Sequence, residues 1–343
     1  MSVELVRHLS QIVAGCEALH CDVFTDVSMA ERTTYGVGGK AACLVKTSHE
    51  VAPLVAAMLS SFPDIPVLIL GRGSNLLVSD DGFPGVVVVL SGATGQDAIV
   101  VDGNVVTAGG GVLMPVLARR SVGASRGGLE WCVGIPGTVG GAVRMNAGGH
   151  GADMLTSLMS ADVASCISGK TVTIDVGDLG LHFRGSALQP HHIVTSVRML
   201  THDTTTEQGT AEINGVVSWR REHQPGGRNA GSVFVNPGDG ATSAGALIDA
   251  AGLRGFSIGG AQVSEKHANF IQVSDGAMAL DVLHVMEHVQ DKVNAIHGVH
   301  LYSEVRLCGF DDVTTARFAD PRHVHGERMI AESHLRDLLG DGE

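Results

Sequence analysis

Two glycine-rich segments contain the residue types and spacings that could bind a charged ligand. The first segment comprises Gly71, Arg72, Gly73, Ser74 and Asn75, and it directly follows an apolar run at residues 66–70. Small residues let several backbone N–H groups turn toward an anion without a Cβ in the way, which favours a cradle for a pyrophosphate. The same residues could instead form a sharp connection between two strands. A helix-opening dinucleotide fingerprint is not predicted, because Leu76 stands at its third glycine and residues 78–84 cannot continue as a helix.

The second segment is richer in glycine and less typical of a simple turn. Its distinctive residues are Gly134, Pro136, Gly137, Thr138, Gly140 and Gly141, followed by Asn146 and Gly148. A turn needs one or two glycines, whereas glycines at these steps indicate backbone that another molecule approaches at contact distance. The segment therefore predicts a ligand-binding loop.

Metal and disulfide chemistry are not predicted. His284 and His288 lie four residues apart, a spacing that can bind a metal on a helix, but the intervening residues are not those of H-E-x-x-H and no third ligand lies nearby. These histidines are expected on a solvated helix face. The six cysteines are far apart and include no C-x-x-C, which argues against a disulfide framework or a zinc knuckle.

Composition excludes several classes of partner. Among 343 residues there are 46 glycines, nearly twice the usual roughly 7% share, which favours loops that wrap a ligand. Lys and Arg number 23 against 36 Asp and Glu, so the formal charge of −13 disfavours binding to nucleic acid or anionic lipid. The N-terminal residues lack the pattern of a signal peptide, and no apolar run approaches the ~20 residues needed to span a bilayer. A cytoplasmic protein is expected.

The expected elements divide the chain into four segments: 1–91, 92–204, 205–310 and 311–343. In the first, apolar residues at helical spacing are followed by short apolar strands and a further helix, which predicts a small α/β unit. The second contains short β-like runs between glycine clusters. A Thr-rich polar link over residues 201–210 is expected to lead into the third segment.

Two helices and a strand are predicted in the third segment. The helices cover residues 243–251 and 279–297, and Gly298 is placed to end the longer one. Apolar and polar residues alternate over 299–307, which predicts a strand with Glu304 on its polar face. The polar segment 311–343 is predicted to contain one further helix.

Four motifs in this order resemble those of one enzyme family. They are Gly73-Ser-Asn-Leu-Leu77, Gly134-Ile-Pro-Gly-Thr-Val-Gly-Gly-Ala142 with Asn146-Ala-Gly148, Ala230-Gly-Ser-Val-Phe234, and Ile258-Gly-Gly-Ala-Gln-Val-Ser-Glu-Lys-His-Ala-Asn-Phe270. The chain resembles the UDP-N-acetylenolpyruvoylglucosamine reductases (the MurB family) over residues 31–309. The resemblance implies an α+β fold in which a two-lobed FAD-binding module of the p-cresol methylhydroxylase type precedes a C-terminal α/β substrate domain. The third segment is too short for the insertion that one branch of the family carries, so the chain is expected in the other branch.

The resemblance also implies an activity. The family reduces UDP-N-acetylglucosamine enolpyruvate to UDP-N-acetylmuramate in peptidoglycan precursor synthesis, using noncovalent FAD and NADPH. The two glycine segments would then hold FAD, the partner would be a small UDP-sugar, and we expect a monomer.

Three residues would carry the chemistry if the resemblance holds. Arg184 presents forked donors that suit the substrate carboxylate, and Glu304 is expected to be protonated, to orient a water or to position the proton donor. Ser232 would protonate the carbanion that hydride addition leaves. Spacing alone would make these a surface charge, a solvated strand residue and an ordinary turn serine. The expected substrate contacts are Arg220 and Arg221 to the diphosphate, together with Asn236, Lys266 and His267.

Departures from the family pattern keep two alternatives open. His223 and Val235 stand where the family usually has lysine, and His150 where tyrosine is common. One alternative is another flavin oxidase or dehydrogenase on the same module, for which residues 147–150 resemble a covalent flavin attachment segment; it would not require Ser232. The other is a noncatalytic flavin or sugar-nucleotide sensor, which would tolerate loss of Arg184 or Glu304.

Overall fold

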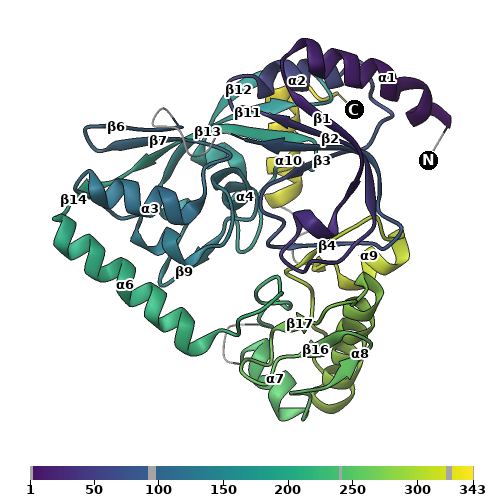
Figure 1. The fold of residues 1–343 in the computed structure, drawn as a ribbon. Coiled ribbons are helices and arrows are strands. Elements are labelled where there is room, and N and C mark those ends of the chain that lie inside the picture. Colours follow the sequence, from purple (N-terminus) through teal and green to yellow (C-terminus); the bar gives the residue numbers. More distant parts are fainter. Residues whose placement is uncertain (1–2, 92–97, 239–241, 322–326, 343) are drawn as a thin grey trace.

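The computed structural model describes residues 3–91, 98–238, 242–321 and 327–342 (Figure 1). Helices and strands are mixed in each part of the chain, which confirms the expected α+β class. No helix within these ranges is both long and apolar enough to cross a bilayer. The expected boundary after residue 91 falls at the start of residues 92–97, outside the described residues.

The first lobe is a four-stranded sheet with two helices on one face. Its elements are α1 (Val3–Ala18), β1 (Asp22–Ser28), β2 (Lys40–Thr47), α2 (Ala52–Leu59), β3 (Val67–Leu70), β4 (Leu76–Val78) and β5 (Phe83–Leu90). Strands β1-β2-β5-β3 form the sheet, in which β5 runs parallel to both neighbours. Val86 and Val88 of β5 are fully buried and pack with Ile12 of α1 and Leu59 of α2. An α/β unit was predicted here, and the structure confirms it.

The second lobe is built on a five-stranded antiparallel sheet in the order β12-β11-β13-β7-β6. Its elements are β6 (Ile99–Asp102), β7 (Val105–Gly109), α3 (Met114–Gly123), β8 (Arg126–Gly127), η3 (Glu130–Gly134), α4 (Val139–Arg144), β9 (Gly148–Gly149), β10 (Ala152–Asp153), α5 (Met154–Ser157), β11 (Leu158–Ser165), β12 (Thr171–Asp175), η4 (Val176–Leu179), β13 (His192–Leu200) and β14 (His202–Asp203). Helices α3 and α4 share its core with buried side chains of β7 and β13, so the sheet supports the second glycine segment.

The long helix α6 (Thr206–His223) was not predicted, and the predicted polar link over 201–210 is correct only for its first residues. The Thr205 hydroxyl accepts a hydrogen bond from the Gln208 amide (3.2 Å), and the Gln208 side chain reaches back, which completes a capping box. Buried Ile213 packs α6 against the second lobe. Figure 1 shows α6 running from that lobe toward the third part of the chain.

The third part contains α7 (Ala244–Ala250), β15 (Ser257–Ile258), β16 (Ala261–Val263), β17 (Ile271–Val273), α8 (Ala279–His297), β18 (Arg306–Cys308) and α9 (Asp312–Phe318). Helix α10 (Glu327–Leu339) follows it and packs on the second lobe. Helix α8 confirms the prediction, and Gly298 ends it in a left-handed conformation (φ +67°). The tail holds two helices, one more than was predicted.

The predicted strand over residues 299–307 is wrong for most of its length. Alternate side chains such as Leu301 and Val305 are indeed buried, but the neighbouring backbone at 230–235 is irregular and supplies a single bridge, Phe234 to Ser303. Only β18 pairs as a strand, and it lies parallel to β4 of the first lobe. The end of the third part is thereby attached to the strand that follows the first glycine segment.

Candidate active site

One cleft of about 800 Å³ lies where the three parts of the chain meet. Both glycine segments line it, as do side chains from the third part. The predicted site residues that line this cleft are Gly71, Arg72, Gly73, Ser74, Asn75, Gly134, Pro136, Gly137, Thr138, Gly141, Gly148, Arg184, Arg220, Ser232 and Glu304. Residues far apart in the sequence thus surround one space.

The first glycine segment is a loop between β3 and β4, with no helix after it. This agrees with the predicted loop between strands. A Cβ built on Gly71 would lie 2.5 Å from the Thr138 hydroxyl oxygen, so any larger residue there would collide with the second glycine segment. Gly73 has φ +60°, a conformation that residues with a Cβ rarely adopt. Neither glycine has room for a side chain, so this loop approaches Thr138 on one side and residues 32–33 on the other at close range.

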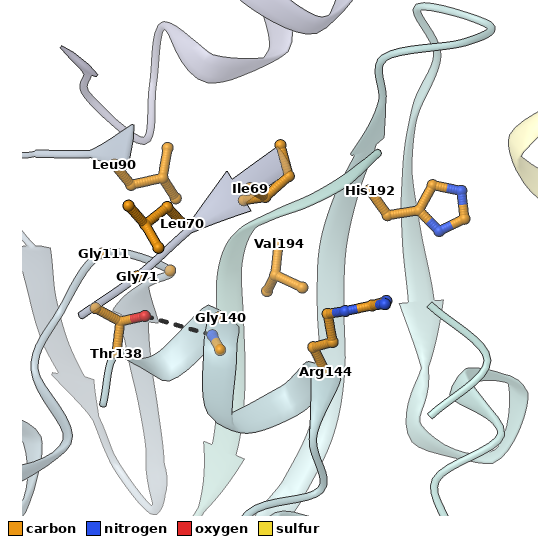
Figure 2. Close-up of a pocket in the computed structure, with 12 residues that line it drawn as sticks. Ile69, Leu70, Gly71, Leu90, Gly111, Thr138, Gly140, Arg144, His192 and Val194 are labelled. Carbon is orange, nitrogen blue, oxygen red and sulfur yellow. Dashed lines mark hydrogen bonds between the residues drawn. The ribbon is translucent and has the colours of Figure 1, made fainter. Parts of the chain in front are cut away.

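The second glycine segment turns into helix α4, which was not predicted. Thr138 caps this helix by accepting a hydrogen bond from the Gly141 amide (3.4 Å; Figure 2). The Gly140 amide donates to the Gly110 carbonyl (2.8 Å), which fixes the segment against β7. Gly140 lines a small pocket of about 40 Å³ that adjoins the large cleft, and Gly71, Thr138 and Gly141 line both.

Arg184 and Glu304 form an ion pair in the cleft. The Arg184 Nε donates to Oε2 of Glu304 (3.1 Å), and its Nη1 donates to the Gly148 carbonyl (3.2 Å). Arg184 has a left-handed backbone (φ +59°), in a loop that also includes the His182–Gly185 bridge. Burial raises the pKa of the Glu304 carboxyl, and the positive charge of Arg184 opposes that rise. A cation and a titratable acid thus stand together beside the glycine loops.

Ser232 lies in a loop that packs beside the Glu304 segment. The next residue, Val233, accepts a hydrogen bond from the Glu304 amide through its carbonyl (2.8 Å). Asn75 of the first glycine segment donates through its side chain to the Glu304 carbonyl (2.9 Å). Three segments from different parts of the chain are therefore held in register around the Arg184–Glu304 pair.

Arg220 is the predicted substrate residue that reaches the cleft. Its guanidinium donates to the Gly134 carbonyl and, through Nε, to the Gln224 side chain (2.8 Å), and burial lowers its pKa. Beside it on α6, Trp219 stacks on His223 with ring centres 4.5 Å apart, and His150 meets Trp219 edge-on at 5.1 Å. Two of the departures from the family pattern are thus in one aromatic group.

Six predicted site residues do not line the large cleft: Gly140, Asn146, Arg221, Asn236, Lys266 and His267. Asn146 is buried, and its side chain binds the His182 carbonyl (3.1 Å) and the Leu155 amide (3.0 Å), so it secures the surrounding segments.

The other substrate candidates among these six are held by contacts within the protein. Lys266 donates to the Arg221 carbonyl (2.6 Å), and Asn236 accepts from the Ala244 amide (2.9 Å) at the start of α7. The His267 ring accepts from the Asn269 amide (3.2 Å), and burial lowers its pKa.

Two further arginines, Arg144 and Arg306, line the cleft and were not predicted as site residues. A signal for Arg306 was present, because it lies two residues after Glu304 and alternate residues of extended chain share a face. Arg144 ends α4, a helix whose existence the glycine-rich sequence does not indicate. Its approach to the cleft depends on how that helix packs.

Two family models match separate ranges of the chain. A model described as an FAD binding domain matches residues 40–175, and one described as the C-terminal domain of UDP-N-acetylenolpyruvoylglucosamine reductase matches residues 223–308. A UDP-N-acetylenolpyruvoylglucosamine reductase of Parasynechococcus marenigrum is 38% identical over 291 residues, which cover 84% of this chain and 96% of that protein. The reductase of Paramagnetospirillum magneticum is 39% identical over 285 residues, 83% of this chain and 91% of that protein.

A solved structure agrees with these relatives. The crystal structure of UDP-N-acetylenolpyruvylglucosamine reductase from Thermus caldophilus superposes with a TM-score of 0.70 at 33% sequence identity, covering 84% of this chain and 98% of that one. The two matched family models together include both glycine segments and the third part of the chain up to residue 308.

Proposed function

The chain belongs to the UDP-N-acetylenolpyruvoylglucosamine reductase family, and from that premise we propose that it reduces UDP-N-acetylglucosamine enolpyruvate to UDP-N-acetylmuramate, a step of peptidoglycan precursor synthesis. The observation that carries the proposal is the convergence of Arg184, Glu304 and Ser232 on one cleft with two bare glycine loops. An α,β-unsaturated carboxylate needs a reductant, a stabiliser of negative charge and a proton donor. The cleft has candidate side chains for the last two, and FAD held by the glycine loops would be the first.

The glycine loops fit FAD as the cofactor. Gly71 has no room for a side chain, and Gly73 has a left-handed backbone that residues with a side chain rarely adopt. Both line the cleft together with Gly137 and Gly141. Such exposed backbone suits the pyrophosphate of a dinucleotide. We assign Gly71, Arg72, Gly73, Ser74 and Asn75, and Gly134, Pro136, Gly137, Thr138, Gly140, Gly141, Asn146 and Gly148, to holding FAD. Bound FAD would supply the hydride, replenished by NADPH, that reduces the enolpyruvyl double bond.

Arg184 and Glu304 have complementary tasks in this proposal. The fixed guanidinium of Arg184 would stabilise the substrate carboxylate as negative charge builds on the adjacent carbon, and such preorganised charge is usually the largest catalytic contribution. Its Nε is already held by Glu304 and its Nη1 by Gly148, which leaves its orientation defined before substrate arrives. Burial raises the pKa of the Glu304 carboxyl, so this side chain holds a proton more readily than an exposed carboxyl would.

Ser232 is the proposed proton donor. A serine hydroxyl is a weak acid, but a carbanion beside a carboxylate is a strong base, and proton transfer needs only a donor at hydrogen-bond distance. The hydrogen bond between Glu304 and Val233 keeps the Ser232 loop beside the ion pair. A water or the Glu304 carboxyl could then return a proton to the hydroxyl.

The UDP portion of the substrate would extend from this centre toward the end of α6. We assign Arg220 and Arg221 to its diphosphate, and Asn236, Lys266 and His267 to further substrate contacts. Lys266 already contacts the Arg221 backbone, so these residues form one group at the edge of the third part. We further propose that the enzyme works as a monomer in the cytoplasm.

The proposal is tested by the flavin itself. Purified protein should show a yellow flavin spectrum, release the flavin on denaturation, be bleached by NADPH under anaerobic conditions, and regain colour on addition of UDP-N-acetylglucosamine enolpyruvate. A colourless protein that ignores added FAD would overturn the proposal. A bleached protein that the enolpyruvyl substrate does not reoxidise would overturn the substrate assignment alone.

A further inference from the structure

The C-terminal segment after β18 connects the third part of the chain back to the second lobe. Phe318 of α9 is buried in the core of the third part, whereas Leu335 and Leu339 of α10 are fully buried in the core of the second lobe. Helix α10, in yellow in Figure 1, packs against β12 and η4 of the second lobe. Both family models end before this segment, at residues 175 and 308. Its contacts are therefore a feature that the assigned activity does not explain.

Asp341, just beyond α10, anchors the segment through buried polar contacts. Its Oδ2 lies 2.7 Å from Nε2 of His192 and 3.3 Å from Nε2 of His191, and its other oxygen accepts a hydrogen bond from the Ser165 hydroxyl. The Asp341 side chain is 6% exposed and that of His192 is 2% exposed. A buried carboxylate with three donors is a strong and directional contact.

The contacts of His192 identify its protonation state. The backbone amide of Gln189 donates to Nδ1 of His192 (3.0 Å), so Nδ1 carries no proton. A neutral imidazole must then carry its proton on Nε2, which donates to Asp341. His191, His192 and Asp341 have the ligand types of a metal site, with ligand atoms within 4.8 Å of one another. Coordination through Nε2 would require a second deprotonation or loss of the Gln189 bond, so the geometry favours a hydrogen-bonded clamp.

His192 does not line the large cleft, but it borders the small pocket that adjoins that cleft. It is the first residue of β13 and lines the small pocket together with Arg144 and Val194 (Figure 2). The Val194 carbonyl would lie 3.3 Å from a Cβ on Gly140, so the start of β13 packs directly against the second glycine segment. A shift of this strand end would move the wall of the small pocket and, through Gly140, the second glycine segment.

We propose that the C-terminal segment secures FAD, with Asp341 as the positioning residue that fixes His192 and the start of β13 in the wall of the small pocket, against the second glycine segment. This inference rests on the proposed FAD-dependent function. Without the Asp341 carboxylate, the buried Nε2–H of His192 and the Ser165 hydroxyl lose their acceptor. An unpaired buried donor is costly, so both groups should move toward water and loosen the strand end.

The test compares Asp341→Ala and Asp341→Asn with His334→Ala. His334 pairs with Asp178 (3.3 Å) between α10 and the second lobe, but both side chains are half-exposed and neither lines the cleft. FAD is titrated into flavin-free full-length protein, and its fluorescence is followed. Both Asp341 variants should raise the FAD dissociation constant about tenfold, as expected for a lost hydrogen bond to a buried charge. His334→Ala should change it less than about twofold, and saturating FAD should restore kcat in the Asp341 variants.

Four results would overturn the clamp. FAD binding by both Asp341 variants with wild-type affinity would remove it, and an equal loss in His334→Ala would assign the effect to general docking of α10. Flavin loss from wild-type protein in EDTA would indicate a metal site instead. Wild-type protein that binds no FAD would overturn this inference and the proposed function together. If the wild type binds FAD and the Asp341 variants bind it with the same dissociation constant, only this inference is overturned.

Discussion

Nε of Arg184 lies 3.1 Å from Oε2 of Glu304, although 120 residues separate the two in the sequence. The contact joins a left-handed turn of the second lobe to an extended segment of the third part. Arg184 also holds the Gly148 carbonyl, so one guanidinium connects the second glycine segment with the Glu304 carboxylate. The geometry of the proposed site thus depends on how the two parts of the chain are docked.

Substitution of Ser232 should separate the two half-reactions. In Ser232→Ala, reduction of the flavin by NADPH should remain near normal, because no proton from Ser232 is needed there. Reoxidation by the enolpyruvyl substrate should slow by about 10²–10⁴-fold, the usual contribution of a general acid. Anaerobic stopped-flow absorbance measures both rates, and Ser257→Ala, an exposed serine of the same part of the chain, is the control. Reoxidation at the wild-type rate in Ser232→Ala would refute the assignment.

Removal of the Arg184 charge should raise the pKa of Glu304 further. Burial already raises the pKa of this carboxyl, and the positive charge of Arg184 is what counteracts the rise. In Arg184→Met the ionised form loses its partner, so the apparent pKa in the pH profile of flavin reoxidation should move to higher pH. Arg198→Met, a substitution in the second lobe outside the cleft lining, should leave the profile unchanged. A downward shift in Arg184→Met would contradict the ion pair.

A methyl group on Gly71 should disturb the cleft. Its Cβ would lie 2.5 Å from the Thr138 hydroxyl oxygen, and relief of such an overlap typically costs about 1–3 kcal/mol. Gly71→Ala should therefore lower the free energy of unfolding by that amount and weaken FAD binding. Gly123→Ala is the matched control, because nothing lies within 4 Å of its added Cβ. Urea unfolding and FAD titration measure the two effects; equal behaviour of the two variants would argue against contact between the glycine loops.

Acidification should destabilise the protein through His192. Burial lowers the pKa of this histidine below its ordinary value near 6.5, and the hydrogen bond that His192 donates to Asp341 only partly offsets that. Between the two pKa values the unfolded chain binds more protons than the folded one, so stability is full above about pH 6.5 and falls as the pH drops below it.

Asp341 titrates in a separate, more acidic range. Burial would raise the pKa of its carboxyl, but the hydrogen bonds from His191, His192 and Ser165 outweigh burial and lower it. The contribution of Asp341 to the free energy of unfolding therefore falls only below about pH 4.

The measurement is urea unfolding between pH 8 and pH 5, in wild type and in His192→Gln. Glutamine cannot titrate, so the wild type should lose more free energy of unfolding than the variant over this pH range. Parallel curves for the two proteins would show that the pKa of His192 does not differ between the folded and unfolded states.

Local signals in the sequence were sufficient for many of the elements. The apolar spacing of α8 and the glycine after it predicted the bounds of that helix, and the continuous valines of β5 predicted a buried strand. The first glycine segment was correctly placed between strands. Helix α6 was not predicted although Thr205 and Gln208 form its capping box. Most of its residues are polar and few of them, such as Ile213, are buried, so the apolar spacing of a helix is weak there. The roles assigned to individual site residues remain predictions.

The sequence alone determined which backbone is bare of side chains. Glycine has no Cβ, so it adopts backbone conformations and permits close contacts that other residues do not, whatever the rest of the fold. Tertiary structure decided which distant groups meet there. Residues 299–307 have the alternating pattern of a strand, yet the chain beside most of them is irregular. Of these residues only those of β18 pair with a neighbouring strand, β4. That pairing brings Glu304 close to Asn75. Likewise, nothing near His192 indicates Asp341, because a contact across 149 residues depends on how sheets and helices pack rather than on any local preference.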